Sequence, residues 1–383
     1  MRHRGIVLVL AVLACGATAL ASSGAGVAAA VPAAVDLLEL PGPATAHGDR
    51  KLLLDVEPGG PGLVAVGEFG LLLASADQGR TWRQMPSPTS VMLTAVDFVD
   101  PRRGWAVGHD GVVLATADGG AHWQRRFDGR QANAAMLAAA QAEVAAAAAA
   151  GGASAPARRD SAADALAAAR DAVEAGPSRP LLAVRFLDAQ AGFVAGAFGQ
   201  LFETGDGGAS WRYIGDRLRN PDGLHLNSLA ATPQGELFIA AEAGRVFRSP
   251  DRGRSWSVAD TGYAGNLYGV LALPPREQHA GALLAYGFNG HLFRSRDRGA
   301  SWSALPPLPR TVVQATVRGD AVLALTEDGA MFSSGDGGDT FRALGEPPAR
   351  RRFSGFAIAG ANLVAVGAGG VSVRAFDANG VPR

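Results

Sequence analysis

A motif that recurs along the chain at nearly constant intervals constrains the fold more than any other feature. It has the form [ST]-x-D-x-G-x-[STH]-[WF] and occurs six times. Its aspartates are Asp77, Asp118, Asp206, Asp251, Asp297 and Asp336. Five of the six tryptophans of the chain also belong to these motifs. Similarity at a fixed period indicates an array of one repeated supersecondary unit.

A second repeated element precedes each aspartate. It reads VGEFGLLL from Val66 in its first copy and occurs seven times. In six copies its second glycine lies seven residues before the motif aspartate, whereas the seventh copy, from Val366, leads to a decayed motif at Asp377. A short turn that ends in glycine between apolar runs predicts a β-hairpin, because such a turn needs a positive φ.

The spacing of the units predicts an all-β fold. The second glycines of successive copies lie 41, 88, 45, 46, 39 and 41 residues apart. A period in the low forties with four short strands is typical of a β-propeller blade, so residues 35–383 are expected to form a seven-bladed β-propeller. We expect the last blade to lack an outer strand. The segment Val35–Pro41, VDLLELP, is expected to pair with this blade and close the ring, which would remove an exposed sheet edge.

The interval of 88 residues contains one repeat and an alanine-rich insertion, residues 129–179. Alanine is the strongest helix former, so two helices are expected, Gln131–Ala150 and Ser161–Pro177. A capping box of Ser161 and Asp164 would start the second helix. The insertion follows the outer strand of the second blade. It is either a loosely packed decoration or a helical hairpin that docks a partner.

The repeated aspartates have two possible roles. They could be metal-binding or catalytic carboxylates, or they could close their own turns by accepting backbone hydrogen bonds. A catalytic group is rarely copied six times around a ring, so repetition favours the turn-closing role. We expect these turns to lie at the end of the propeller opposite the hairpin tips.

The hairpin tips vary where the scaffold does not, and variable loops on a rigid scaffold are where binding residues are found. We predict a mildly acidic, partly aromatic face that binds a protein or peptide. The alternative is a set of ordinary solvated turns. The candidate binding residues are Glu68, Phe69, His109, Asp110, Phe198, Glu242, Phe288, Asn289, Glu327 and Asp328.

The aspartate motif resembles the Asp-box, or bacterial neuraminidase repeat. Together with the VGxxGxLL element, it makes nearly all of residues 35–380 similar to the photosystem II stability/assembly factor-like family. The resemblance implies a non-catalytic exported scaffold or assembly factor that binds a membrane protein or membrane-associated complex. It points to a photosystem subunit or a resistance-nodulation-division type exporter as the partner. We expect a monomer.

Asp-boxes also occur in sialidases, so a glycoside hydrolase is the alternative function. Such an enzyme could pair Glu242 with Glu68 or Glu327, because glycosidases use two carboxyl groups across the scissile bond. A complete sialidase set of residues does not stand out. The histidines are scattered without ligand spacing, and no basic stripe or phosphate-binding loop stands out. We therefore expect no metal, no cofactor and no nucleic-acid partner.

The N-terminus, residues 1–21, predicts a signal peptide. Arg2 and Arg4 precede an apolar run, and Ala19–Ala21 has the small-residue pattern of a cleavage site. The protein is thus expected to be exported, to the periplasm. Cys15 is the only cysteine and offers lipid anchoring as an alternative. Cleavage after Ala21 would leave a mature chain without thiol chemistry.

Overall fold

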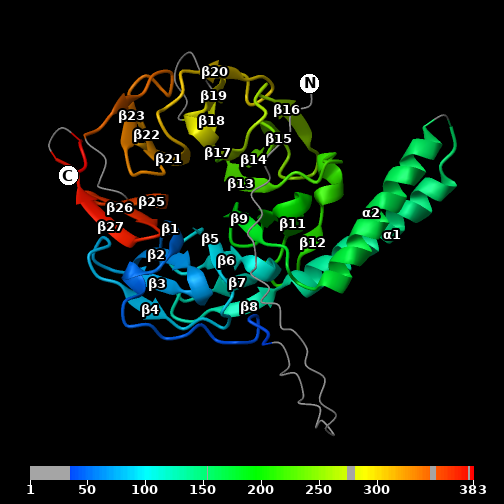
Figure 1. The fold of residues 1–383 in the computed structure, drawn as a ribbon, viewed down its shortest axis with the longest axis horizontal. Helices are drawn as coiled ribbons and strands as arrows, with labels where there is room; N and C mark the ends of the chain where they lie inside the picture. Colours follow the sequence, from blue (N-terminus) through cyan, green and yellow to red (C-terminus); the bar gives the residue numbers. More distant parts are fainter. Residues whose placement is uncertain (1–34, 153, 274–280, 346–350, 378–379) are drawn as a thin grey trace, which may run out of the picture. The chain divides into compact units, whose positions relative to one another are not determined.

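Each sheet consists of strands that are consecutive in the sequence, and each strand pairs with its neighbours along the chain. The computed structural model describes residues 35–383 except 153, 274–280, 346–350 and 378–379. The signal peptide and Cys15 lie outside the described residues. Within them the strands form six four-stranded antiparallel sheets and one three-stranded sheet. Each sheet is one blade, which confirms the predicted seven-bladed β-propeller (Figure 1).

The first three blades consist of the following strands: β1 Leu53–Gly59, β2 Gly62–Gly67, β3 Leu72–Ser75 and β4 Arg83–Met85; β5 Leu93–Phe98, β6 Gly104–Gly108, β7 Val113–Thr116 and β8 Gln124–Phe127; β9 Leu181–Phe186, β10 Gly192–Gly196, β11 Leu201–Thr204 and β12 Arg212–Tyr213. The next three consist of β13 Leu226–Ala231, β14 Leu237–Ala241, β15 Arg245–Ser249 and β16 Ser257–Asp260; β17 Leu267–Ala272, β18 Leu283–Gly287, β19 Leu292–Ser295 and β20 Ser303–Leu305; β21 Val312–Arg318, β22 Ala321–Thr326, β23 Met331–Ser334 and β24 Arg342–Ala343. The seventh has β25 Phe353–Ala359, β26 Asn362–Gly367 and β27 Gly370–Ala375.

The first strand of every blade packs against the first strands of its two neighbours. These contacts run from β1 through β5, β9, β13, β17 and β21 to β25, and β25 returns to β1. Side chains reinforce them: Thr94 Oγ1 donates to the Leu181 carbonyl at 2.6 Å, and Ser354 Oγ donates to the Leu53 carbonyl at 2.8 Å. Because the second bond joins blade seven to blade one, the same kind of interaction that links internal blades also closes the ring.

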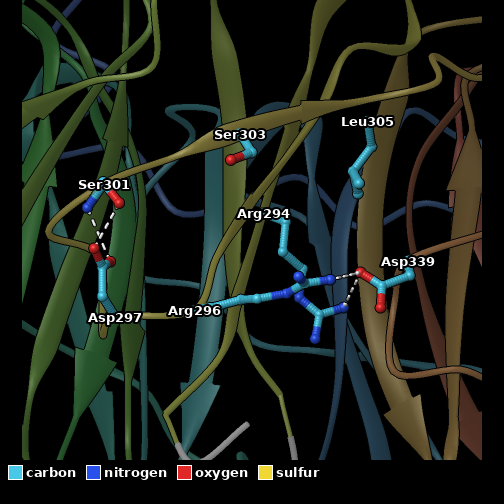
Figure 2. A pocket seen from close by; sticks show the side chains of 7 residues that line it. All are labelled: Arg294, Arg296, Asp297, Ser301, Ser303, Leu305 and Asp339. Atoms are coloured by element: carbon cyan, nitrogen blue, oxygen red, sulfur yellow. Dashed lines mark hydrogen bonds and ion pairs between the residues drawn. The ribbon is translucent and has the colours of Figure 1, made fainter.

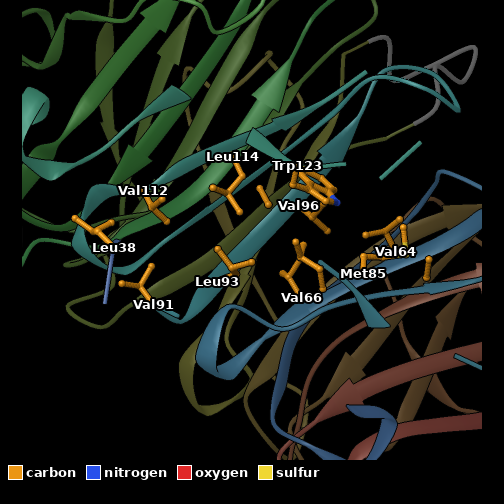
Figure 3. Packing of buried hydrophobic residues seen from close by; sticks show 13 residues of the cluster. Leu38, Val64, Val66, Met85, Val91, Leu93, Val96, Val112, Leu114 and Trp123 are labelled. Carbon is orange, nitrogen blue, oxygen red and sulfur yellow. The ribbon is translucent and has the colours of Figure 1, made fainter. Parts of the chain in front are cut away.

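Apolar side chains between adjacent blades form the core. Between blades one and two, Val64, Val66, Leu93 and Leu114 are buried together (Figure 3). The motif tryptophan Trp123 joins this cluster, so it packs at the interface with the preceding blade. Burying a large apolar side chain of this kind stabilises the fold by roughly 1.5–3 kcal/mol. The repeated tryptophan therefore serves blade-to-blade packing.

The predicted N-terminal strand is absent. The segment 36–41 forms turns rather than a strand, and Leu38 is buried in the cluster between blades one and two. Arg125 Nη1 of β8 donates to the Leu38 carbonyl at 2.6 Å, and the Ser90 N–H donates to the Leu37 carbonyl. The prediction that Val35–Pro41 closes blade seven is therefore wrong. Leu38 is buried between blades one and two, and the backbone of this segment bonds to Arg125 and Ser90. As expected, the C-terminal repeat supplies only three strands to the last blade among the described residues.

The alanine-rich insertion forms a helical hairpin, as predicted. Helix α1 spans Gly129–Ala149 and helix α2 spans Ala155–Ala175, and the two pack along their length. The capping box lies at Asp128 and Gln131 of α1, not at Ser161 and Asp164. Both of those residues are inside α2, because the preceding residues continue the helix back to Ala155. No helix among the described residues is long and apolar enough to cross a membrane.

Candidate binding face

The hairpin tips and the starts of the first strands share one end of the propeller, because Leu53 at the start of β1 pairs with Gly67 at the end of β2. This end is called the tip face below. The helical hairpin connects β8 to the start of β9 and therefore begins and ends at the same face. At its start the backbone of Gly129 packs against the carbonyl of Asp110. The insertion thus borders the His109–Asp110 tip.

Several hairpin tips hold side-chain-bearing residues in a left-handed backbone. Their glycines have positive φ, as the sequence predicts, but the residue before the glycine is left-handed in five blades as well. Two of these residues are bulky: Phe69 has φ 52° and Phe198 has φ 57°. A left-handed backbone costs a side-chain-bearing residue about 1–2 kcal/mol. Such strain concentrates at functional positions, so both phenylalanines are candidate binding residues.

The tip phenylalanines are also exposed. Phe69, Phe198 and Phe288 are 60%, 54% and 45% exposed to solvent. Aromatic anchors of this kind dominate the energy of many protein interfaces. The tip face therefore carries apolar surface that the fold itself does not use.

A polar and aromatic cluster surrounds Phe198. The Arg179 guanidinium lies 5.0 Å from the centre of the Phe198 ring, and the His225 ring meets the same ring edge-on at 4.9 Å. Glu242 accepts a hydrogen bond from the His225 N–H at 2.8 Å, and its carboxylate lies 3.1 Å from His225 Nδ1. Arg179 also reaches the Ala168 carbonyl of α2. The cluster thus connects blades three and four to the helical hairpin.

A small pocket lies beside Phe69. Its volume is about 150 Å³, and it is lined by Pro43, Thr45, Lys51, Glu68, Phe69 and Leu71. Lys51 is exposed and is the only lysine of the sequence. The Glu68 carboxylate accepts from the Leu52 N–H at 3.3 Å. The pocket therefore combines apolar walls with one cation and one anion.

The remaining candidate residues are engaged with the scaffold. The Phe288 carbonyl accepts from the Tyr263 hydroxyl at 3.1 Å, and the Asn289 N–H donates to Thr311. Glu327 pairs with Arg352 at 3.1 Å, and Asp328 accepts from the Thr326 hydroxyl at 2.7 Å. Burial raises the pKa of the Asp110 carboxyl above its ordinary value.

The carboxylates proposed for a glycosidase have separate partners. Glu242 is held by His225, Glu327 by Arg352 and Glu68 by the Leu52 N–H. These partners belong to the blade of each carboxylate or to its neighbour along the ring. Each carboxylate therefore has its own hydrogen-bond partner. These bonds do not indicate a substrate position shared by two of the carboxylates.

The six motif aspartates lie at the opposite end and accept hydrogen bonds from their own turns. In the first copy, Asp77 accepts from the Ser75 hydroxyl at 2.9 Å and from the Thr81 N–H and hydroxyl at 2.9 and 2.7 Å. The Thr81 hydroxyl and N–H hold the pKa of Asp77 at about 2. The pattern repeats at Asp118, Asp206, Asp251, Asp297 and Asp336. These carboxylates are charged and occupied as turn acceptors.

A cavity of about 240 Å³ lies at this end between blades five and six (Figure 2). Arg294 and Arg296 both pair with Asp339, at 3.2 and 2.8 Å. The Arg294 guanidinium also donates to the Gly337 carbonyl. The ion pairs at this cavity therefore link blade five to blade six.

The centre of the ring holds a polar cavity of about 220 Å³ to which all seven blades contribute. Asp55 accepts from the Val96 N–H at 2.9 Å, and so connects blade one to blade two. Burial, with repulsion from Asp55, raises the pKa of Glu57 to about 8. Arg185 pairs with the buried Asp97 at 2.9 Å. Asp55 and Arg185 therefore have structural partners in adjacent blades.

Comparison with known proteins identifies the family. The model of the photosynthesis system II assembly factor YCF48 matches residues 73–143 and 164–305, more than half of the chain. The chain belongs to this family. The resemblance deduced from the repeats is thereby confirmed. None of the curated proteins compared with the chain matches it.

Solved structures of similar fold include two YCF48 proteins. YCF48 bound to D1 peptide is 17% identical, with a TM-score of 0.58, and the match covers 85% of this chain and 93% of that one. YCF48 from Cyanidioschyzon merolae is 15% identical, with a TM-score of 0.57 and coverages of 88% and 98%. The extracellular domain of the putative one component system BT4673 from B. thetaiotaomicron is 11% identical, with a TM-score of 0.56; the match covers 86% of this chain and 39% of that one. At these identities the likeness shows the fold.

Several residues of the binding face of this YCF48-family chain could not be predicted from the repeats. Arg179, His225 and Lys51 join the tip face only in three dimensions, because none belongs to the repeated tip element. A signal did exist for the central cavity: Asp55, Glu57 and Arg185 interrupt otherwise apolar first strands. No group of three or more histidine, cysteine or acidic residues suited to a metal is present in the described ranges.

Proposed function

We propose that the protein is an exported, non-catalytic assembly factor that binds an exposed segment of a membrane protein through the tip face. Family membership and the fold shared with a YCF48 that binds a D1 peptide support this role. The observation that carries it is the pair Phe69 and Phe198, which are exposed although their backbone is left-handed. A turn under no selection for binding would favour glycine or asparagine at these positions.

The test replaces both phenylalanines by asparagine. Asparagine tolerates the left-handed conformation, so Phe69→Asn with Phe198→Asn keeps the turns and removes the aromatic surface. The mature protein is purified from its native envelope after mild crosslinking, and co-purifying proteins are identified by mass spectrometry. We expect a reproducible inner-membrane partner with the wild type and its loss with the double variant.

The matched control is Val258→Asn, which removes another exposed apolar side chain on the outer strand β16. It should leave the partner in place. Equal recovery with wild type and double variant would refute binding through these aromatics. Deleting Gln131–Gly176 in the same assay asks whether the helical hairpin contributes to docking.

Export has its own measurement. The mature N-terminus should begin at Ser22 in the periplasmic fraction, as cleavage after Ala21 requires. A lipid-modified N-terminal Cys15 would instead identify the membrane-anchored form. A chain that retains Met1 in the cytoplasm would contradict export.

A further inference from the structure

The cavity at the ring centre reaches the tip face. The first strands of the seven blades begin at that face and surround the centre (Figure 1). The second residue of every first strand lines the cavity: Leu54, Thr94, Leu182, Asn227, Tyr268, Val313 and Ser354. Glu57 also lines it and lies three positions beyond Leu54 on β1, about 10 Å further from the tip face at a rise of about 3.3 Å per residue. The cavity therefore extends from the tip face to a carboxyl group inside the ring.

Hydrogen bonds between blades occupy most polar side chains of this cavity. Each of these side chains bonds to a backbone group of the next blade; for example, Asn227 Nδ2 donates to the Leu267 carbonyl at 2.8 Å. The residues bound in this way are Thr94, Ser354, Asp55, Asn227 and Gln314. They hold the ring together, so their presence in the cavity is explained without a ligand.

Glu57 is the exception. It makes no hydrogen bond or ion pair with any described residue. The surrounding protein is dense enough to raise the pKa of its carboxyl to about 8, yet the side chain keeps some accessible surface because it faces the cavity. Polar groups inside native proteins normally have a partner. An unpaired carboxyl group that is enclosed in this way indicates a ligand.

The charges around Glu57 favour a cation as that ligand. Arg185 is the one cation that lines the cavity among the described residues, and its guanidinium pairs with the buried Asp97 at 2.9 Å. Asp55 and Glu57 also line the cavity, so three carboxyl groups face a single guanidinium. Repulsion between carboxyl groups disfavours their charged forms, and a further cation between them would relieve it.

The rest of the lining favours an organic cation over a metal ion. The described ranges contain no group of three or more histidine, cysteine or acidic residues suited to a metal. Near the tip face the walls are apolar and aromatic, with Leu54, Leu182 and Val313 beside Tyr268. An aliphatic chain packs on such walls while its charged end reaches a polar partner, and a tyrosine ring attracts the charge itself. The volume of about 220 Å³, against roughly 30 Å³ for one water molecule, admits a group the size of a side chain.

We propose that the central cavity binds one organic cation, an ammonium or guanidinium group on an aliphatic chain, with Glu57 as its counter-ion. The site goes beyond the proposed function, because it lies inside the ring and none of the tip aromatics lines it. The cation comes either from a free amine or from a lysine or arginine side chain of a protein bound on the tip face. Both sources present the same charged group to Glu57.

The test measures binding of butylammonium chloride to the mature chain at pH 8.5 by isothermal titration calorimetry. We expect saturable binding, and much weaker binding of 1-butanol, which has the same alkyl chain without the charge. Glu57→Gln keeps the size of the side chain and breaks no hydrogen bond, but it removes the counter-ion, so affinity should fall at least about tenfold. Glu174→Gln, an exposed change on α2, should bind as the wild type does. Circular dichroism checks that both variants fold.

A second readout uses the wild type alone. At pH 7 the Glu57 carboxyl is mostly protonated, because its pKa is about 8, and a bound cation favours the charged form. Butylammonium should therefore release a proton at pH 7 and bind more tightly at pH 8.5, as titrations in buffers of different ionisation enthalpy will show. The other titratable groups of the cavity are Asp55, Asp97, Arg185, Tyr268 and Tyr286. Burial raises the pKa of both tyrosines, so they stay neutral in this range.

Three results would overturn the proposal. Equal affinity of butylammonium for Glu57→Gln and wild type, or equal binding of butylammonium and 1-butanol, would remove the counter-ion role. Absence of saturable binding up to about 10 mM butylammonium would remove the site, since such an affinity corresponds to less than about 3 kcal/mol. Tighter, Glu57-dependent binding of calcium from calcium chloride would assign the cavity to a metal ion instead.

The envelope crosslinking assay distinguishes the two sources of the cation. Loss of the inner-membrane partner with Glu57→Gln, but not with Glu174→Gln, would assign the cation to a side chain of that partner. Recovery of the partner with a variant that no longer binds butylammonium would assign the site to a free amine.

The outcome is also distinguishable from failure of the proposed function. The Phe69→Asn, Phe198→Asn variant should bind butylammonium as the wild type does, because neither residue lines the cavity. If butylammonium binds through Glu57 but no envelope partner is found, the cavity site stands and the proposed function falls.

Discussion

At the scale of single residues, the tip phenylalanines combine strain with exposure. Phe69 occupies a left-handed backbone that asparagine adopts at lower cost. We therefore expect Phe69→Asn to raise the free energy of unfolding by about 1 kcal/mol, measured by urea denaturation. Phe288→Asn is the matched control: Phe288 is similarly exposed, but its φ is not positive, so no gain is expected. A loss of stability with Phe69→Asn would show that the ring contributes packing energy exceeding the strain.

The central cavity contains a second informative residue. Burial and the neighbouring Asp55 raise the pKa of Glu57 from its ordinary 4.5 to about 8. Between these values the folded state holds a proton that the unfolded state has lost, so stability falls as pH rises. Glu57→Gln stays neutral in both states and should flatten this decline. At pH 8.5 its thermal midpoint should exceed that of the wild type by about 2–4 °C.

The measurement is a series of thermal melts from pH 4.5 to pH 8.5. Glu174→Gln, an exposed change on α2, serves as the control and should leave the pH profile unchanged. Parallel profiles for Glu57→Gln and wild type would mean that water in the cavity solvates the carboxylate fully.

At the scale of elements, the helical hairpin depends on one buried amide. Asn133 of α1 is 4% exposed and donates to the Ala172 carbonyl at 2.7 Å and the Gly176 carbonyl at 3.0 Å. Small alanines provide the rest of the contact, including Ala162, Ala169 and Ala172. A polar residue at such a position fixes register, as in coiled coils.

We expect Asn133→Ala to destabilise the hairpin by about 1–3 kcal/mol, because it leaves buried carbonyls without a donor. Hydrogen exchange of the α2 amides should accelerate, while the blades keep their protection. Gln141→Ala removes an exposed amide from the same helix and should have no such effect. Unchanged exchange in Asn133→Ala would assign the register to alanine packing alone.

At the scale of the whole molecule, blade seven meets blade one without a shared strand among the described residues. The contact rests on β1 against β25 and on the Ser354 hydroxyl at the Leu53 carbonyl. Ser354→Ala should lower the free energy of unfolding by about 1 kcal/mol. Urea denaturation measures this, with the exposed Ser303→Ala as control. A loss of cooperativity in Ser354→Ala, seen as a smaller urea slope, would show that this bond holds the ring as one unit.

Repetition made the architecture predictable, but segments that do not repeat were harder to assign to a structure. VDLLELP has the local pattern of an outer strand, yet the burial of Leu38 between blades one and two decides its place. Ser161 and Asp164 fit a capping box, yet the helix-forming residues before them extend α2 to Ala155. Both errors arose because a local pattern was judged without its three-dimensional neighbours.

The sequence by itself determined the blades, their number and order, the hairpin tips, and the helical insertion. This was possible because every repeat has the same turn residues and the same strand pattern. Seven matching copies indicate one repeated unit and therefore one fold. Only the tertiary structure decided the rest: the left-handed phenylalanines, the Arg179–Phe198–His225 cluster and the shared cavity at the ring centre. Those features depend on residues that are far apart in sequence or on backbone angles, and no local pattern encodes either.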